Sequence, residues 1–269
     1  MRRLLQFASR LSVNAVFLLA LIFEGLAAMP ACAQVVAGTS YENSSGSAAL
    51  TGSVTMTSVD ANSVVIVSVA LDDTGTAGTI SVPTATGLTF VQIGSTLRTS
   101  MEFRLAVFRA WTTSARGSTV ITCTWTQSTA WDIGATDFTG TAGTAANNGS
   151  DAIGTTNTAT GASTTQTVTV NSSSHNNSKY LGVVGYNNGT ITKGANYTNC
   201  VPNTNNTVLS LLTEISTNPV SPAANTAVNS TATNAGDDHY GIFGIELLVA
   251  TATAACTPSL PLLGVGRCG

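Results

Sequence analysis

The chain has 269 residues, with ten Lys and Arg against thirteen Asp and Glu, and a net charge of −3. Charged residues make up only 9% of it, where about 25% is usual, and no basic cluster offers a footprint for nucleic acid. Hydrophobic residues make up 43% and fall in patterned runs, which excludes a disordered chain. We therefore expect a folded protein whose partner is not a nucleic acid.

The first 33 residues are predicted to be a secretory signal peptide, forming a helix. They begin with basic residues, continue with an apolar core over 15–23 that Glu24 interrupts, and end in Ala31-Cys32-Ala33. The core is shorter than the roughly 20 residues of a membrane span. A lipoprotein cut before Cys32 and an uncleaved anchor are the alternatives. The leader holds three basic residues and one acidic residue, so the mature chain has a net charge of −5, and we expect it to be secreted with no membrane segment.

After an N-terminal extension (34–52), alternating and β-branched runs predict many short strands and almost no helix. Asn148-Gly149 and similar pairs predict turns between them. The predicted strands cover 53–59, 63–71, 79–83, 88–94, 101–111, 118–126, 131–140, 165–170, 179–186, 206–215, 226–233 and 240–250. We expect an all-β protein, an antiparallel β-sandwich of jelly-roll-like type over 53–250.

The strand pattern occurs twice, in pseudo-repeat halves of about 53–140 and 165–250. The run "AWDIGATDFTG" is answered by "HYGIFGIELLV", which places Trp131 on Tyr240 and Asp137 on Glu246. Repeats this long indicate two similar half-structures rather than a solenoid. The segment 140–164, poor in large apolar residues, is predicted to be a surface crossover between them. Two separate small domains are the alternative.

The succession "GLTFVQIG", "MEFRLAVFRAW", "GSTVITCTWTQSTAWDIGATDFTG" and "YLGVVGYNNGTITKGANYT" resembles a group of exported bacterial and phage-associated β-sandwich domains. The resemblance covers roughly residues 50 to 250 and rests on pattern rather than on a diagnostic motif. It implies a scaffold in a surface, adhesin-like or virion-associated protein. It brings no catalytic residues to this chain.

Four cysteines remain after the leader, an even number that favours disulfides in an exported chain. Cys256 and Cys268 enclose a loop rich in Pro and Gly, so we expect them to pair and to close the C-terminal tail (251–269). Closing such a loop contributes about 3 kcal/mol. This leaves Cys123 to pair with Cys200, although four cysteines allow three connectivities.

Aromatic side chains are the first candidates for ligand contact, because their faces stack on sugar rings. Trp111, Trp131 and Tyr186 are the candidate glycan contacts, with burial in the core as the alternative for such large side chains. Alternation in "STAWDIGATDFTG" puts Trp131 and Asp132 on opposite faces, with Asp137 on the Trp131 face. Trp125 alternates in phase with Cys123, which favours its burial.

Two pairs of adjacent aspartates are candidates for calcium, which prefers several oxygen ligands. Asp72 and Asp73 end a predicted strand, and Asp237 and Asp238 precede another. Aspartates also accumulate at turns because they cap the local backbone. Apart from this candidate calcium we expect no cofactor.

Support for catalysis is weak. The two histidines, His175 and His239, lie in polar loop sequences, and no Gly-x-Ser-x-Gly elbow occurs. A glycoside hydrolase would need two acids across a groove. The acids available for such a pair are Glu102, Asp132, Asp137, Glu214 and Glu246.

We therefore expect a secreted, non-catalytic β-sandwich with a structural or adhesive role at a cell surface, in an extracellular matrix or on a virion. Its partner would be a surface polymer or glycan, or another copy joined through strand edges. The alternatives are a carbohydrate-binding module, with or without calcium, and a glycan-cleaving enzyme.

Overall fold

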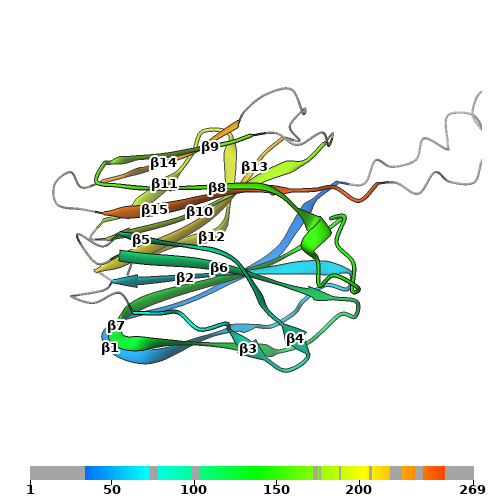
Figure 1. Cartoon of the computed structure of the whole chain (residues 1–269), viewed down its shortest axis with the longest axis horizontal. Coiled ribbons are helices and arrows are strands. Elements are labelled where there is room, and N and C mark those ends of the chain that lie inside the picture. The colour runs from blue at the N-terminus through cyan, green and yellow to red at the C-terminus, as the bar shows by residue number, and fades with distance from the viewer. Residues whose placement is uncertain are drawn as a thin grey trace, which may run out of the picture. The chain divides into compact units, whose positions relative to one another are not determined.

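The computed structural model describes residues 34–72, 78–98, 103–171, 175, 177–187, 189–205, 208–218, 226–233 and 239–251. They form three antiparallel sheets (Figure 1), which confirms the prediction of an all-β protein. In these ranges, no helix has the length and apolarity to cross a membrane. The predicted signal peptide (1–33) and all but the first residue of the C-terminal tail lie outside the described residues.

The first sheet has seven strands in the order β4-β3-β7-β2-β6-β5, with β1 also paired to β7. Its strands are β1 (Val36–Met56), β2 (Ser63–Asp72), β3 (Thr84–Ala85), β4 (Leu88–Thr89), β5 (Val91–Arg98), β6 (Phe103–Thr112) and β7 (Thr119–Thr139). β1 and β7 are 21 residues long and fold the sheet over on itself. The first part of β7 pairs with the end of β1 and with β3, and its second part pairs with the start of β1 and with β2.

The second and third sheets hold the rest of the chain, after a short 3-10 turn (Ser150–Ala152). The five-stranded sheet has the order β12-β13-β10-β15-β8, and the three-stranded sheet has the order β11-β14-β9. Their strands are β8 (Ile153–Gly161), β9 (Thr165–Val170), β10 (Lys179–Asn187), β11 (Ile191–Lys193), β12 (Tyr197–Asn205), β13 (Leu209–Ser216), β14 (Thr226–Ala232) and β15 (Tyr240–Leu247).

The strands stack in four layers, two from each half of the chain (Figure 1). The inner sheet of the first half consists of β2, β5 and β6 together with the start of β1 and the end of β7. Its outer sheet consists of β3 and β4 together with the end of β1 and the start of β7. The five-stranded sheet is the inner sheet of the second half, and the three-stranded sheet is its outer sheet. Burial follows this order, because the inner strands β2, β10, β13 and β15 are buried on both faces, whereas β9 alternates between exposed and buried residues.

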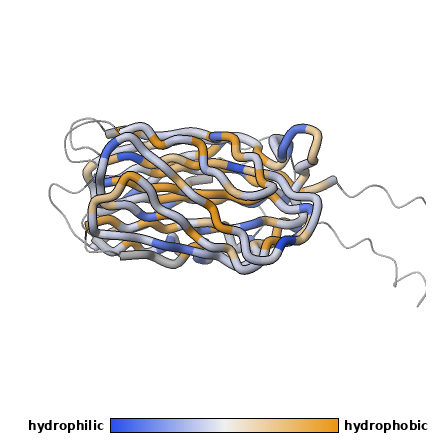
Figure 2. The backbone as a smooth tube through the Cα atoms, turned by 90° about the horizontal axis from the view of Figure 1, so that it is seen from below, coloured by the Kyte–Doolittle hydropathy of each residue, from blue (hydrophilic) through white to orange (hydrophobic). Residues whose placement is uncertain are grey.

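Three apolar cores fill the spaces between the four layers. The first-half core, with Val67, Phe108 and Ile133, lies inside the folded first sheet. The central core, with Leu105 and Phe243, joins the two inner sheets, and the second-half core, with Tyr186, lies under the three-stranded sheet. Figure 2 looks onto the first half and shows hydrophobic and polar residues interleaved along its strands. The halves share the central core, so they are not separate domains.

Strand pairing is the same in both halves. β2 lies between β6 and the end of β7, and β10 lies between β13 and β15 in the same sense. Trp131 pairs with Leu71 and Tyr240 pairs with Tyr186, while Asp137 and Glu246 lie six residues further along their strands. β1 pairs with the other side of β7, and β8 pairs with the other side of β15. Equivalent positions in the two halves can therefore be assigned from the pairing alone.

Two polar segments form strands where the sequence predicted none. β1 begins at Val36, inside the expected N-terminal extension (34–52), and β8 occupies 153–161 of the expected crossover (140–164). Both strands have many exposed Ser, Thr and Asn residues. An exposed strand carries little apolar alternation, so its sequence resembles a loop.

Candidate functional site

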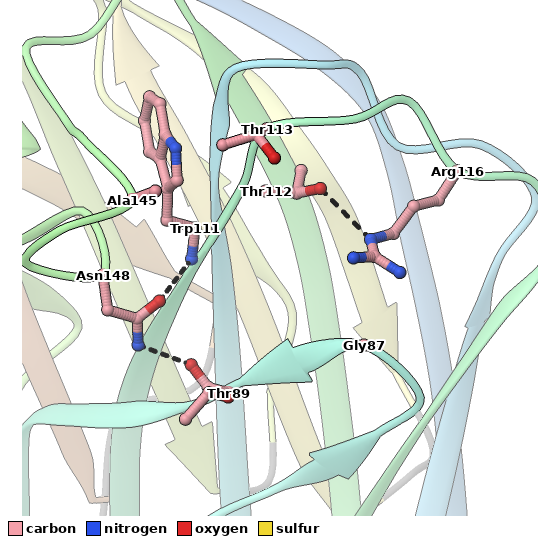
Figure 3. A pocket seen from close by; sticks show the side chains of 8 residues that line it. All are labelled: Gly87, Thr89, Trp111, Thr112, Thr113, Arg116, Ala145 and Asn148. Carbon is pink, nitrogen blue, oxygen red and sulfur yellow. Dashed lines mark hydrogen bonds between the residues drawn. The ribbon is translucent and has the colours of Figure 1, made fainter.

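Trp111, at the end of β6, is half-buried and packs against the central core, whereas Trp125 and Trp131 are only 4% and 7% exposed. It borders a groove of about 400 Å³ on the first half. We call this the Trp111 groove; Figure 3 shows the residues that line it, Gly87, Thr89, Trp111, Thr112, Thr113, Arg116, Ala145 and Asn148.

Asn148 connects the two sides of the Trp111 groove. Its side-chain Oδ1 accepts a hydrogen bond from the backbone N–H of Trp111 (2.9 Å), and its Nδ2 donates to the carbonyl of Thr89 (2.6 Å; Figure 3). Asn148 and Gly149 have positive φ angles of 51° and 73°, so this Asn-Gly pair makes the turn that the sequence predicted. The turn also brings the backbone of Gly149 against the indole of Trp111.

Arg116 is the charged residue that lines the Trp111 groove. Arg116 donates from Nε to Thr112 Oγ1 (3.1 Å) and lies beside Gly87. Arg109, which is not among the lining residues, donates to the carbonyls of Asn147 and Asn148. Burial lowers the pKa of Arg109, and the nearby carboxylate of Asp151 opposes this.

The Trp111 groove has the chemistry of a polar binding site. Its lining residues offer an aromatic face, a guanidinium, hydroxyls and an amide. These groups suit a neutral or weakly anionic polar ligand such as a sugar, because an indole covers the apolar face of a ring while amides and hydroxyls bond to its rim.

The other two candidate glycan contacts are wrong. Tyr186 is fully buried in the second-half core, and Trp131 packs in the first-half core with its ring centroid 6.0 Å from that of Trp125. Both lie on inner sheets covered on both faces, so neither can stack on a ligand. Trp125 is buried, as its alternation with Cys123 predicted.

The pairing of Cys123 with Cys200 is also wrong, because both are free thiols. Cys123 belongs to the first-half core and Cys200 to the central core, so the inner sheet of the first half lies between them. Burial raises the pKa of each thiol to about 12, which keeps both protonated. Cys256 and Cys268 lie outside the described residues.

Of the four candidate calcium ligands, only Asp72 is described; Asp73, Asp237 and Asp238 lie outside the described residues. The Oδ1 atom of Asp72 accepts a hydrogen bond from Asn187 Nδ2 at 2.9 Å. In the part of the chain that the structure covers, no group of three or more His, Cys, Asp or Glu residues could hold a metal ion.

The buried acids do not share a groove. Asp132, beside Ala70, faces the central core, whereas Asp137 shares its face of β7 with Trp131, as alternation predicted. Burial raises the pKa of Asp137, while its Oδ2 accepts a hydrogen bond from the Asp60 N–H (2.7 Å). The Glu246 carboxylate accepts one from the Thr155 N–H (3.2 Å).

Glu214 of β13 combines full burial, a carboxylate oxygen without a hydrogen-bond partner and a raised pKa. It is fully buried beside Gly182, and its Oε2 accepts a hydrogen bond from the Gly194 N–H at 2.8 Å. Its Oε1 has no hydrogen-bond partner. Burial raises its pKa to about 7, against the opposing effects of the Gly194 bond and Lys193. The sequence offered Glu214 only as one acid among several, and no local pattern marks it.

No family model, no curated protein and no solved structure matches this chain.

Proposed function

We propose that this chain is a secreted, non-catalytic protein with a structural or adhesive role at a cell surface, in a matrix or on a virion. Export through the signal peptide (1–33) and closure of the tail by Cys256 and Cys268 are parts of the proposal that rest on the sequence. The resemblance to exported jelly-roll-like sandwich domains also rests on the sequence.

The observation that supports this role most directly is the composition of the two outer sheets, both of which present threonine to solvent. In the first half these residues are Thr51, Thr55, Thr84, Thr124 and Thr126, and in the second half they are Thr165, Thr167, Thr169, Thr192 and Thr231. Threonine hydroxyls and methyls make an uncharged surface, suited to a neutral polymer with many hydroxyls rather than to a charged partner.

A free strand edge supports the second form of the same role, assembly of copies. Among the described residues, β8 ends the five-stranded sheet and pairs with one strand, β15. An unpaired edge can template a strand from another chain. A polymer-binding surface and a free edge together fit a protein that builds or attaches to an extracellular layer.

The test is light scattering of the mature chain, 34–269, combined with a glycan array. The structural role predicts an oligomer or filament, or retention on an insoluble surface polymer. A strict monomer that binds one soluble glycan would contradict it. Release of a cleaved sugar would contradict the non-catalytic assignment.

A carbohydrate-binding module is the second candidate, because the half-buried Trp111 lines a groove together with Arg116 and Asn148. In that case Trp111→Ala abolishes binding on the array. Thr55→Ala, on the outer sheet and away from the Trp111 groove, is the matched control and keeps full binding. Equal binding by both variants would exclude this groove as the site.

A further inference from the structure

The contacts across the central core follow an approximate two-fold symmetry between the halves. β1 of the first half contacts β12, and its equivalent β8 contacts β5, the equivalent of β12. In the same way β7 contacts β13 and β15 contacts β6, while β2 meets its own equivalent β10. This is the pattern of an isologous dimer interface, made here within one chain.

The symmetry holds at the level of residues. Strand pairing makes Ala70 equivalent to Gly185 and Asp72 equivalent to Asn187. A residue on a two-fold axis contacts its own equivalent. The methyl of Ala70 lies 3.3 Å from the ideal β-carbon position of Gly185, and Asp72 accepts the 2.9 Å hydrogen bond from Asn187. The pseudo-axis therefore passes between β2 and β10.

Away from the axis, the same contact occurs at two equivalent places, with the glycine and the large residue exchanged between the two strands. Gly134 of β7 faces Val201 of β12, and a β-carbon on this glycine would lie 3.0 Å from Val201 Cγ2. The equivalent contact joins Phe243 of β15 to Gly94 of β5, where a β-carbon would lie 2.7 Å from Phe243 Cε1. In both places a large side chain fills the space above a glycine of the other half.

These pairs discriminate between partners. Two first halves would bring Gly134 against Gly94, which leaves a void, and Asp72 against Asp72, which apposes two carboxylates. Two second halves would bring Phe243 against Val201, with no glycine to make room. Specific pairing needs such costs for the wrong partner as well as contacts to the right one.

We propose that the inner sheet of each half is a binding surface specific for the other half, so that the chain is a single-chain heterodimer whose halves have lost the ability to pair with themselves. The partner of each surface is the opposite half, recognised by the exchanged glycine contacts and by the Asp72–Asn187 hydrogen bond. This inference is independent of the proposed function.

The first test cuts the full chain. A site for a specific protease is inserted between Ala145 and Ala146, two exposed residues between β7 and β8. The cut protein is then unfolded, refolded and examined by native mass spectrometry. We expect a complex of one first half with one second half and no dimer of either half alone. Homodimers as abundant as the mixed complex would overturn the proposal.

The second test keeps the chain uncut, so refolding of the pieces is not needed. Phe243→Gly and Gly94→Val together reproduce at one contact the residues of the other. We expect the double variant to lose less stability in urea than the sum of the two single losses. The matched control combines Gly94→Val with Val201→Gly, which belong to different contacts, and its losses add. Additive losses for the contacting pair as well would refute the exchanged-size contacts.

Discussion

The first-half core and the second-half core have the same strands in the same order but different chemistry. Phe108 of the first half, opposite Val67, is replaced in the second half by Glu214, opposite Gly182. The Trp131 indole is replaced by the Tyr240 phenol. One core is thus almost wholly apolar, whereas the other holds a carboxyl group and several tyrosines.

The two cores separate the features that the architecture requires from those that it leaves free. Strand order, register and the alternation of buried and exposed faces are common to both halves, whereas the identity of the buried side chains is not. Volume is exchanged between neighbours in the second half, where Glu214 Cγ and Val228 Cγ1 occupy the space above Gly182. Cores tolerate such exchange when total volume and patterning are kept.

Transferring the acid from the second core to the first should have the largest effect. Phe108→Glu places a carboxyl in an apolar core, away from the Gly194 N–H that Glu214 uses. We expect a loss of at least about 4 kcal/mol in the free energy of unfolding, because an unpaired buried acid is among the costliest substitutions. Urea denaturation measures it, with Phe108→Leu as the control at about 1 kcal/mol. Similar losses for the two variants would show that the first core accepts an acid.

Removing the acid from the second core should change how stability depends on pH. The pKa of Glu214 is about 7 in the folded chain, above its usual 4.5. Its stabilising effect is therefore complete below pH 4.5 and is lost as the pH rises through 7. The full shift corresponds to about 3 kcal/mol.

We expect Glu214→Gln to flatten this decline and to be more stable than the parent chain at pH 8. Thermal unfolding between pH 4 and pH 9 gives the comparison. Asp137→Asn is the parallel variant from the first half: burial also raises the pKa of Asp137, so this substitution should flatten the decline as well. If Glu214→Gln leaves the pH dependence unchanged, the acid is not protonated in the folded chain at neutral pH.

The sequence predicted the parts of the fold that apolar pattern controls. The runs that became β2 and β10 are buried on both faces, so their sequences are continuously apolar and easily identified. The echo of Trp131 in Tyr240 and of Asp137 in Glu246 relied on this pattern, and strand pairing places these residues at equivalent positions. β8 could not be predicted in this way, because none of its residues is buried.

The site residues were less predictable because they depend on contacts between distant strands. Cys123 and Cys200 are separated by a sheet, which no spacing reveals. The groove around Trp111 exists because Asn148 binds across to Thr89, although the Asn-Gly turn itself was predicted. The burial of Tyr186 depends on the three-stranded sheet that covers β10, whose position follows from tertiary packing alone.

A matched pair of glycines gives the smallest expected effect. Gly38 of β1 packs against the Asp137 carboxylate, and Gly154 of β8 packs against that of Glu246; in each case a β-carbon would overlap an oxygen. We expect Gly38→Ala to cost about 2 kcal/mol and Gly154→Ala about half of that, because the longer Glu246 side chain can shift and the shorter Asp137 cannot. Urea denaturation of both variants measures the difference. A larger loss for Gly154→Ala would mean that the second half holds its acid more rigidly than the first, the reverse of what its more polar core implies.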